Sequence, residues 1–246
     1  MGICWQYKDI STIGWEIVAK QDNCRTMTNQ MRDQIFQGYS DAATPEFIAD
    51  YEAIDIGLFY QGVMDLFLQT QSRIIDIGAG TGRDAAWLAD WGHEVTAVEP
   101  VKKLSEAGKQ LHEQQNIVWV DDSLPNLAKI PNENQFELVL LAGVWQHLND
   151  GEREIAIRKI SKIIAPKGLV IMALRHGIAS PNRPVFAIDV KATIELALQN
   201  QFEPLRQYEA ASIRPQNIAN GVTWTWLVLK RKVEPPIARD PASSAG

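Results

Sequence analysis

The sequence contains few cysteines and no long apolar run. Its two cysteines, Cys4 and Cys24, lie near the N-terminus, and one possible disulfide in a chain of this length is weak support for an oxidising compartment. No run of about eighteen apolar residues occurs, which argues against a membrane-spanning helix. The first residues also lack the basic and apolar segments of a signal peptide. We therefore expect a cytoplasmic protein with reduced thiols.

The sequence also lacks an excess of basic residues. Among its 246 residues, 24 lysines and arginines face 30 aspartates and glutamates, which gives a formal net charge of −6. Proteins that bind nucleic acids usually need a basic surface that neutralises phosphates, so no nucleic-acid partner is expected. Hydrophobic residues make up 46% of the chain, which is enough for a sizeable buried core.

Short apolar runs alternate with amphipathic segments through most of the chain. Strands are predicted at 74–77, 94–99, 116–120, 136–142, 169–174, 204–209 and 222–230, and helices at 83–91, 101–114, 150–164 and 190–198. This alternation is typical of a doubly wound, Rossmann-like α/β fold with a mostly parallel sheet, here of seven strands. The last two strands have no convincing helix between them, so we expect an antiparallel strand at one edge.

The segments on either side of this pattern differ from it. Apolar residues recur at three- and four-residue steps over residues 45–70, which predicts a helix that begins at Pro45. Residues 1–40 show no clear period, and residues 233–246 are rich in proline and small residues, which is typical of disorder. The predicted parts are an N-terminal helical cap (1–70), an α/β domain (71–232) and a disordered tail (233–246).

Three glycines follow the first predicted strand at alternate positions, and a carboxylate precedes them. Gly78, Gly80 and Gly82 let the backbone turn sharply and approach a ligand closely. In open α/β sheets, ligands bind at such turns beyond the carboxyl ends of the strands. The spacing G-x-G-x-G differs from the G-x-G-x-x-G of dinucleotide sites, and Asp76 would repel a pyrophosphate. This carboxylate would instead suit a ligand that carries an amine and no phosphate.

The segment from Asp76 to Gly82, Asp-Ile-Gly-Ala-Gly-Thr-Gly, resembles the first motif of the class I S-adenosylmethionine-dependent methyltransferases. The resemblance is to the broad bacterial small-molecule group and runs from about Arg73 to Leu174. Glu99 ends the second predicted strand, where this family has an acidic residue that accepts hydrogen bonds from both ribose hydroxyls. The resemblance implies S-adenosylmethionine as the cofactor, and no metal site is predicted.

The same resemblance implies further cofactor contacts. The family commonly has an acidic residue after the third strand that accepts from the adenine amino group, and Asp122 is preferred over Asp121 for this role. The alternative is that both carboxylates cap the next turn. Backbone after the fourth strand lies along the methionine part of the cofactor in this family. The predicted cofactor-binding residues are Asp76, Gly78, Ala79, Gly80, Gly82, Arg83, Glu99, Pro100, Asp121, Asp122, Ser123, Ala142 and Gly143.

Other residues near the same sheet edge are candidates for the acceptor site. His147 is a candidate general base, although methyl transfer from a sulfonium needs a base only when the acceptor arrives protonated. Trp145 is a candidate for the pocket wall, with core packing as the alternative. Arg175 after the fifth predicted strand would suit an anionic acceptor, with a solvated side chain as the alternative. Tyr51, from the helical cap, completes the predicted pocket.

Missing motifs narrow the acceptor class. The sequence has no Asn-Pro-Pro-Tyr or Asp-Pro-Pro-Tyr segment of the kind used on exocyclic amines of nucleic-acid bases, and no Pro-Cys nucleophile for cytosine. A small-molecule acceptor is therefore expected, without a membrane or nucleic-acid partner. Two alternatives stay open. One is a protein that binds S-adenosylmethionine without methyl transfer, as a sensor or degenerate subunit, and the other is an NAD-dependent oxidoreductase.

Overall fold

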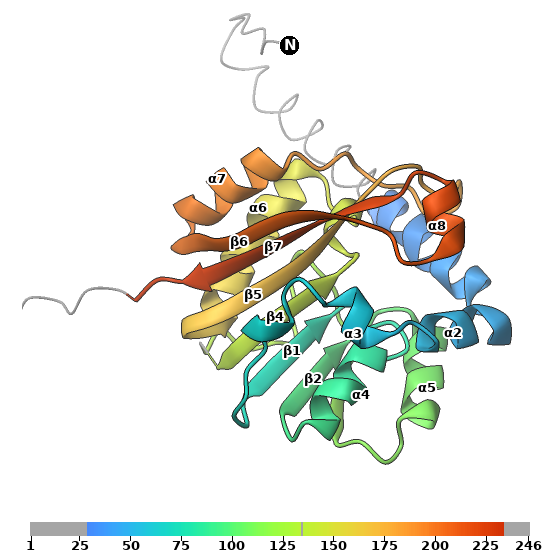
Figure 1. The fold of residues 1–246 in the computed structure, drawn as a ribbon, viewed down its shortest axis with the longest axis horizontal. Coiled ribbons are helices and arrows are strands. Elements are labelled where there is room, and N and C mark those ends of the chain that lie inside the picture. The colour runs from blue at the N-terminus through green and yellow to red at the C-terminus, as the bar shows by residue number, and fades with distance from the viewer. Residues whose placement is uncertain (1–28, 134, 234–246) are drawn as a thin grey trace, which may run out of the picture.

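A single seven-stranded sheet forms the centre of the protein (Figure 1). The structure is a computed structural model that describes residues 29–133 and 135–233. The strands are β1 (Arg73–Ile77), β2 (Glu94–Val98), β3 (Ile117–Val120), β4 (Phe136–Ala142), β5 (Ile164–His176), β6 (Phe202–Ala211) and β7 (Thr223–Arg231), in the order β3-β2-β1-β4-β5-β7-β6. β1 to β5 run parallel, whereas β7 is antiparallel to both β5 and β6. The predicted fold class is confirmed, and the antiparallel strand lies one place in from the edge.

Helices cover both faces of the sheet. They are α4 (Arg83–Asp90), α5 (Lys102–Leu111), α6 (Asp150–Ile163), α7 (Val190–Gln199) and α8 (Pro215–Ala219), with a 3-10 turn, η2 (Trp145–His147), after β4. Successive side chains of a strand point to opposite faces, so β1 contributes to two hydrophobic cores. Ile75 shares one core with Ile157 of α6, and Ile74 shares the other with Leu88 of α4. Asp76 therefore lies on the α4 side of the sheet.

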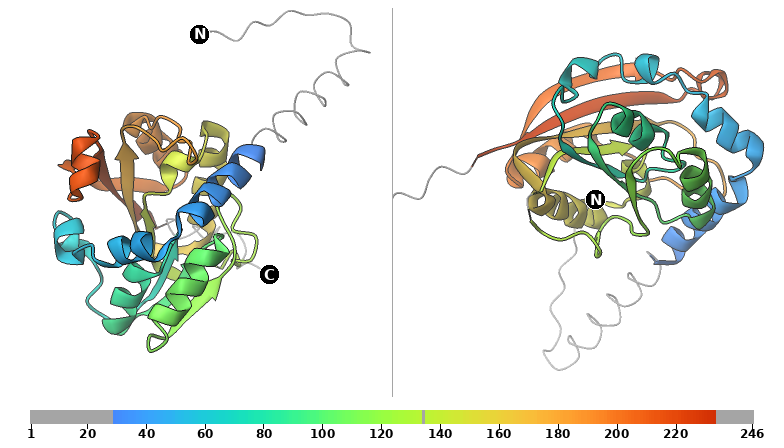
Figure 2. Two further views of the ribbon diagram at one scale, coloured as in Figure 1. Left: turned by 90° about the vertical axis from the view of Figure 1, so that its right-hand side faces the viewer. Right: turned by 90° about the horizontal axis from the view of Figure 1, so that it is seen from below.

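The N-terminal part of the described chain lies at the end of the sheet toward which the parallel strands point (Figures 1 and 2). It comprises a helix over residues 29–42, α2 (Pro45–Glu52), α3 (Ile56–Phe59) and a 3-10 turn, η1 (Met64–Leu66). Arg32 forms an ion pair with Glu152 of α6, and the Thr81 hydroxyl donates to Glu52. These contacts hold the segment over the carboxyl ends of β1, β2 and β4, where ligands bind in open α/β sheets.

One prediction for this segment is wrong. Residues 45–70 do not form one helix, because α2 ends at Glu52 and the side chain of Asp55 accepts from the Leu58 amide at 2.7 Å, which starts a new turn. Residues 29–42 are helical although no period is evident in them. Ile35 and Gly38 are the buried residues in the described part of this helix, so it buries too narrow a stripe to produce an apolar period.

Other boundaries differ by a few residues, and the short helix α8 lies between the last two strands, where no helix was predicted. The predictions for Cys4, Cys24 and the tail after residue 233 fall outside the described residues. Within the described ranges, no helix is long and apolar enough to cross a membrane.

Candidate active site

The turn between β1 and α4 is built on glycines in a left-handed conformation. Gly78, Gly80 and Gly82 have φ angles of 74°, 60° and 78°, which residues with a Cβ atom rarely adopt. A Cβ on Gly82 would lie 2.6 Å from the Trp119 ring, whereas a Cβ on Gly80 would meet no atom within 4 Å. Gly82 thus packs against the protein, and Gly80 faces open space where a ligand can approach the backbone.

Glu99, which follows β2, is held at this turn by backbone amides. Its Oε2 accepts from the Gly80 amide at 2.8 Å and its Oε1 accepts from the Val101 amide at 2.7 Å. The side chain is buried, and burial raises its pKa to about 7 although both amide hydrogen bonds act to lower it. Each carboxylate oxygen keeps a free lone pair, so the oriented carboxylate can accept hydrogen bonds from two ligand hydroxyls.

A second acidic group lies on the other side of the turn. Asp76 is buried, and its pKa is raised well above the usual value by burial and by the nearby charge of Asp84. Asp84 accepts from the Tyr60 hydroxyl at 2.6 Å and forms an ion pair with Arg83 at 2.6 Å. Arg83 also donates to the Tyr51 carbonyl at 3.1 Å, so its guanidinium links α4 to the N-terminal cap and does not lie free on the surface. A cationic ligand group would restore the charged form of Asp76.

Two adjoining cavities open around this turn. The inner cavity, of about 130 Å³, has Glu99, Pro100, Ser123 and apolar side chains such as Leu104 in its wall. The outer cavity, of about 610 Å³, extends from Asp76 and Arg83 toward Arg175. The two share eight lining residues, namely Tyr39, Tyr51, Gly78, Gly80, Thr81, Ala142, Gly143 and His147. The predicted site residues that line neither cavity are Gly82, Asp121, Asp122 and Trp145.

The carboxylates after β3 have other partners. Asp122 accepts from the Ser123 amide at 2.8 Å and from the Lys129 amide at 2.6 Å, so it caps the following turn. The Asp121 side chain is largely exposed, 3.7 Å from the Lys129 ammonium. The structure therefore favours the capping alternative for Asp122, whereas Asp121 faces solvent, and Ser123 is the residue of this group that reaches the inner cavity.

A tyrosine and a histidine meet where the cavities join. The Tyr39 hydroxyl lies 3.0 Å from Nε2 of His147, and Nδ1 of His147 lies 3.1 Å from the Pro184 carbonyl. A carbonyl only accepts, so Nδ1 carries the proton and Nε2 accepts from Tyr39. Burial lowers the pKa of His147 to about 4, and the charges of Arg183 and Arg175 act in the same direction. His147 is therefore neutral near pH 7, and its unprotonated Nε2 faces the Tyr39 hydroxyl.

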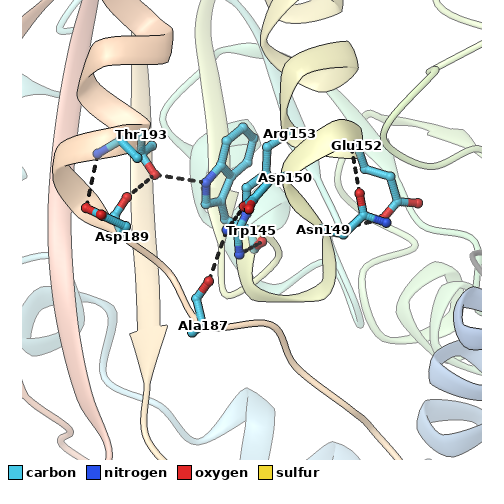
Figure 3. A network of polar contacts seen from close by, with 9 residues as sticks. Trp145, Asn149, Asp150, Glu152, Arg153, Ala187, Asp189 and Thr193 are labelled. Carbon is cyan, nitrogen blue, oxygen red and sulfur yellow. Dashed lines mark hydrogen bonds and ion pairs between the residues drawn. The ribbon is translucent and has the colours of Figure 1, made fainter. Parts of the chain in front are cut away.

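A network of polar contacts joins η2 to α6 and to the loop that follows β5 (Figure 3). Arg153 of α6 donates to the Trp145 carbonyl at 3.4 Å and to the Ala187 carbonyl at 3.0 Å, so it joins η2 to the loop over residues 177–189. The same helix begins with a capping box between Asn149 and Glu152.

The predicted pocket role of Trp145 is wrong. Its side chain is 1% exposed, lies in the core of the α6 face and donates to the Thr193 hydroxyl at 3.4 Å. The 3-10 turn points this ring into the core while His147, two residues later, faces the cavities. The indole in the outer-cavity wall belongs to Trp224 instead.

Comparison with known proteins agrees with this geometry. Residues 74–168 match a family model described as a methyltransferase domain. This segment is therefore identified as a methyltransferase domain. An uncharacterized methyltransferase from Bacillus licheniformis is 28% identical over 138 residues, which cover 55% of this chain and 62% of the relative. Glycine N-methyltransferase from Rattus norvegicus is 26% identical over 159 residues, which cover 56% of this chain and 52% of the relative.

The chain thus spans less than two thirds of these relatives. Among solved structures, the fold of this methyltransferase domain resembles a Burkholderia thailandensis 1,6-didemethyltoxoflavin-N1-methyltransferase with bound S-adenosylhomocysteine. The TM-score is 0.58 at 16% identity, and the match covers 93% of this chain and 94% of that one. An S-adenosylmethionine-dependent methyltransferase structure from Listeria monocytogenes, described as putative, gives 0.59 at 12% identity over 71% of this chain and 98% of that one.

Several residues of the candidate site have no sequence motif that would have identified them. Tyr39 lies 108 positions from its partner His147, in a helix without an apolar period. Arg183 lies in an irregular loop, and Trp224 is one of two tryptophans in β7. They become visible only once the cap, the loop over residues 177–189 and β7 come together around the outer cavity.

Proposed function

We propose that the protein is an S-adenosylmethionine-dependent methyltransferase that acts on a small-molecule acceptor in the cytoplasm. The observation that carries this proposal is the buried Glu99 carboxylate, which two backbone amides orient into the wall of the inner cavity. The family resemblance and the matched methyltransferase domain support it. We further propose the predicted division into an N-terminal cap and a cofactor-binding domain, because residues 29–52 cover the cavities.

The cofactor fits the residues present. Glu99 would accept from the ribose hydroxyls, and the inner cavity, with Leu104 and Leu124 in its wall, suits a flat apolar base. Asp76 would face the ammonium of the methionine part, and Gly80 leaves room for the ligand beside the turn. The Asp76 carboxylate at the glycine turn would repel a pyrophosphate, which disfavours an NAD-dependent oxidoreductase.

The chain's own residues would mainly align the reactants. The bound cofactor supplies a methyl group on a sulfonium with a neutral leaving group. Holding the acceptor in line with that methyl group would supply a large part of the rate, about 7–11 kcal/mol in well-oriented reactions. The cap excludes water, and the neutral His147 can take a proton through the Tyr39 hydroxyl if the acceptor arrives protonated.

A small-molecule acceptor is supported by the shape of the site. The outer cavity is bounded by the cap, by the loop over residues 177–189 and by α8, and it has a volume of about 610 Å³, which is the size of a small-ligand site. The names of several similar proteins contain small acceptors, such as glycine and 1,6-didemethyltoxoflavin. The net charge of −6 does not favour a nucleic-acid partner.

The test is transfer of a labelled methyl group from S-adenosylmethionine to a metabolite extract. We expect a labelled low-molecular-weight product with the wild-type protein and a much weaker one with Glu99→Gln. If the protein binds S-adenosylhomocysteine and labels nothing in extracts from several sources, the result favours the alternative function, a protein that binds the cofactor without methyl transfer. Label that appears only in macromolecules would contradict the small-molecule acceptor.

A further inference from the structure

Arginines line the part of the outer cavity that lies away from the glycine turn. Arg175 is the next-to-last residue of β5, which is separated from β1 by β4. Arg183 lies in the loop over residues 177–189, and Arg214 precedes α8. Arg214 is 3.5 Å from Asp50. Among the described residues, no carboxylate lies within 4.0 Å of the guanidinium of Arg175 or Arg183. Half-buried guanidinium groups without an anionic partner are sites that carboxylates and phosphates bind.

Protein contacts hold both guanidinium groups at the cavity. Arg175 donates to the Ile178 carbonyl at 3.0 Å. The Arg183 guanidinium lies 4.9 Å from the centre of the Tyr39 ring and 5.6 Å from that of Phe47. A cation–π contact places a guanidinium but leaves its N–H donors free at the edge. Both groups therefore remain able to bind an oxyanion.

The loop that carries Arg183 is anchored on both sides of it. The Phe186 amide donates to the Gln146 carbonyl at 2.7 Å, and the Pro184 carbonyl accepts from His147. On the cap side, a Cβ on Gly38 would lie 2.0 Å from the Asn182 carbonyl oxygen, so the helix over residues 29–42 packs tightly on this loop. The anchored loop makes the oxyanion site largely preformed, which lowers the entropic cost of binding.

Opposite charges line separate parts of the outer cavity. Its acidic lining residues are Asp76 and Asp84, and Asp84 is already paired with Arg83. Aromatic and aliphatic side chains, among them Phe59, Ile178 and Trp224, line the space as well. A cationic cofactor at Asp76 and an anionic acceptor at the arginines would each meet the opposite charge, with the apolar lining around the body of the acceptor.

From this arrangement we infer that the acceptor is a small oxyanion, a carboxylate or a phosphate ester with an apolar body, and that Arg175 and Arg183 bind its charged group. This inference rests on the proposed function, since it concerns the acceptor for the same site. It goes further in naming the charge and the residues that select it.

The experiment titrates model anions into the protein saturated with S-adenosylhomocysteine. Benzoate and phenyl phosphate are the probes, benzamide is their neutral counterpart, and heat is recorded by calorimetry. Hydrogen bonds to charged groups contribute about 1.5–3 kcal/mol, so at least one anion should bind about 10- to 100-fold more tightly than benzamide. The anion that binds more tightly identifies the charged group of the acceptor as a carboxylate or a phosphate ester.

Variants then assign the preference to residues. Arg183→Gln and Arg175→Gln should each remove most of the preference for the anion over benzamide, and Arg183→Lys should keep part of this preference. Arg158→Gln, on the exposed side of α6, should leave the preference intact. Equal binding of benzamide, no anion binding in the millimolar range, or an undiminished preference in both glutamine variants would overturn the inference. S-adenosylhomocysteine affinity is measured in every variant. If the wild type binds S-adenosylhomocysteine but shows no anion preference, only the acceptor inference fails. If the wild type does not bind S-adenosylhomocysteine, the proposed function itself is refuted.

Discussion

The Gly80 amide donates a hydrogen bond to Oε2 of Glu99 at 2.8 Å. This bond joins the glycine-rich turn after β1 to the end of β2, so two elements that are neighbours in the sheet also share one ligand-facing group. The contact explains why a carboxylate can be buried here without an arginine or lysine beside it, because two backbone amides compensate part of its lost hydration.

The first prediction concerns this carboxylate. Glu99→Gln replaces one of the two acceptor oxygens with an amide that cannot accept, and hydrogen bonds to charged groups contribute about 1.5–3 kcal/mol. S-adenosylhomocysteine affinity should therefore fall about 10- to 100-fold, as measured by calorimetry. Glu94→Gln, at the exposed start of β2, is the matched control and should bind S-adenosylhomocysteine like wild type. Equal affinities in the two variants would remove Glu99 from the site.

The second prediction concerns pH. Burial raises the pKa of Glu99 to about 7 in the ligand-free protein, and a ligand that donates to the carboxylate favours its ionised form. S-adenosylhomocysteine affinity should rise with pH up to about 7 and then level off, with proton release on binding below that pH. Glu99→Gln should flatten this profile.

The raised pKa of Glu99 also affects the free energy of unfolding, which should fall as the pH rises, whereas the ligand affinity should rise. A carboxyl whose pKa is raised on folding favours the folded state most below its unfolded pKa, so this contribution is lost as the pH rises toward 7. In Glu99→Gln, the free energy of unfolding should no longer contain this decline. Calorimetry and urea unfolding at several pH values check both signs, and parallel profiles for wild type and variant would contradict them.

A third prediction separates backbone strain from ligand space. Gly80 and Gly92 both have positive φ angles, 60° and 89°, and a Cβ on either would meet no protein atom within 4 Å. Gly80→Ala and Gly92→Ala should each destabilise the protein by about 1–2 kcal/mol, the usual cost of a left-handed conformation for alanine. Only Gly80→Ala should also weaken S-adenosylhomocysteine binding. If both variants bind alike, the open space at Gly80 is not the ligand's.

The fourth prediction concerns the network in Figure 3. Arg153→Met should remove the donors to the Trp145 and Ala187 carbonyls and destabilise the protein by about 2–4 kcal/mol in urea unfolding. Arg158→Met, one helical turn and a residue further along α6, breaks an exposed pair with Glu154 at 3.7 Å and should cost less than about 1 kcal/mol. Similar losses in the two variants would mean that the network is not a structural anchor.

The fifth prediction concerns the protonation of His147. Burial lowers its pKa to about 4, and the Pro184 carbonyl fixes the proton on Nδ1. Nitrogen-15 NMR of labelled histidine should show the neutral Nδ1–H form from neutral pH down to about pH 5. A depressed histidine pKa contributes stability that is lost as the pH falls below the unfolded value. Titration near pH 6.5, or an Nε2–H tautomer, would contradict the hydrogen bond from Tyr39.

The sheet and the donor side of the site could be predicted because their chemistry is local in sequence. The run that ends at Ile77, the three glycines and Glu99 lie within 26 residues, and strand pairing brings them together without any distant segment. Apolar periodicity predicts the order of the seven strands and of α4, α5, α6 and α7, and the structure confirms that order.

The acceptor side could not be predicted, since it depends on long-range packing. The sequence offers Trp145 as a pocket residue, but the direction of η2 places its ring in the core. The pairing of β7 with β5 brings Trp224 to the outer cavity instead. Asp122 is a carboxylate at the expected strand end, yet a local turn uses both of its oxygens. Helix 29–42 buries too few residues for its period to be visible, although it supplies Tyr39.

The central claim is that the cavities at the glycine turn bind S-adenosylmethionine, and calorimetric titration of the wild-type protein with S-adenosylhomocysteine and NAD, side by side, tests it most directly. We predict saturable one-to-one binding of S-adenosylhomocysteine that weakens in Glu99→Gln, with no measurable binding of NAD. Tighter binding of NAD, or the absence of S-adenosylhomocysteine binding at millimolar concentrations, would contradict the claim.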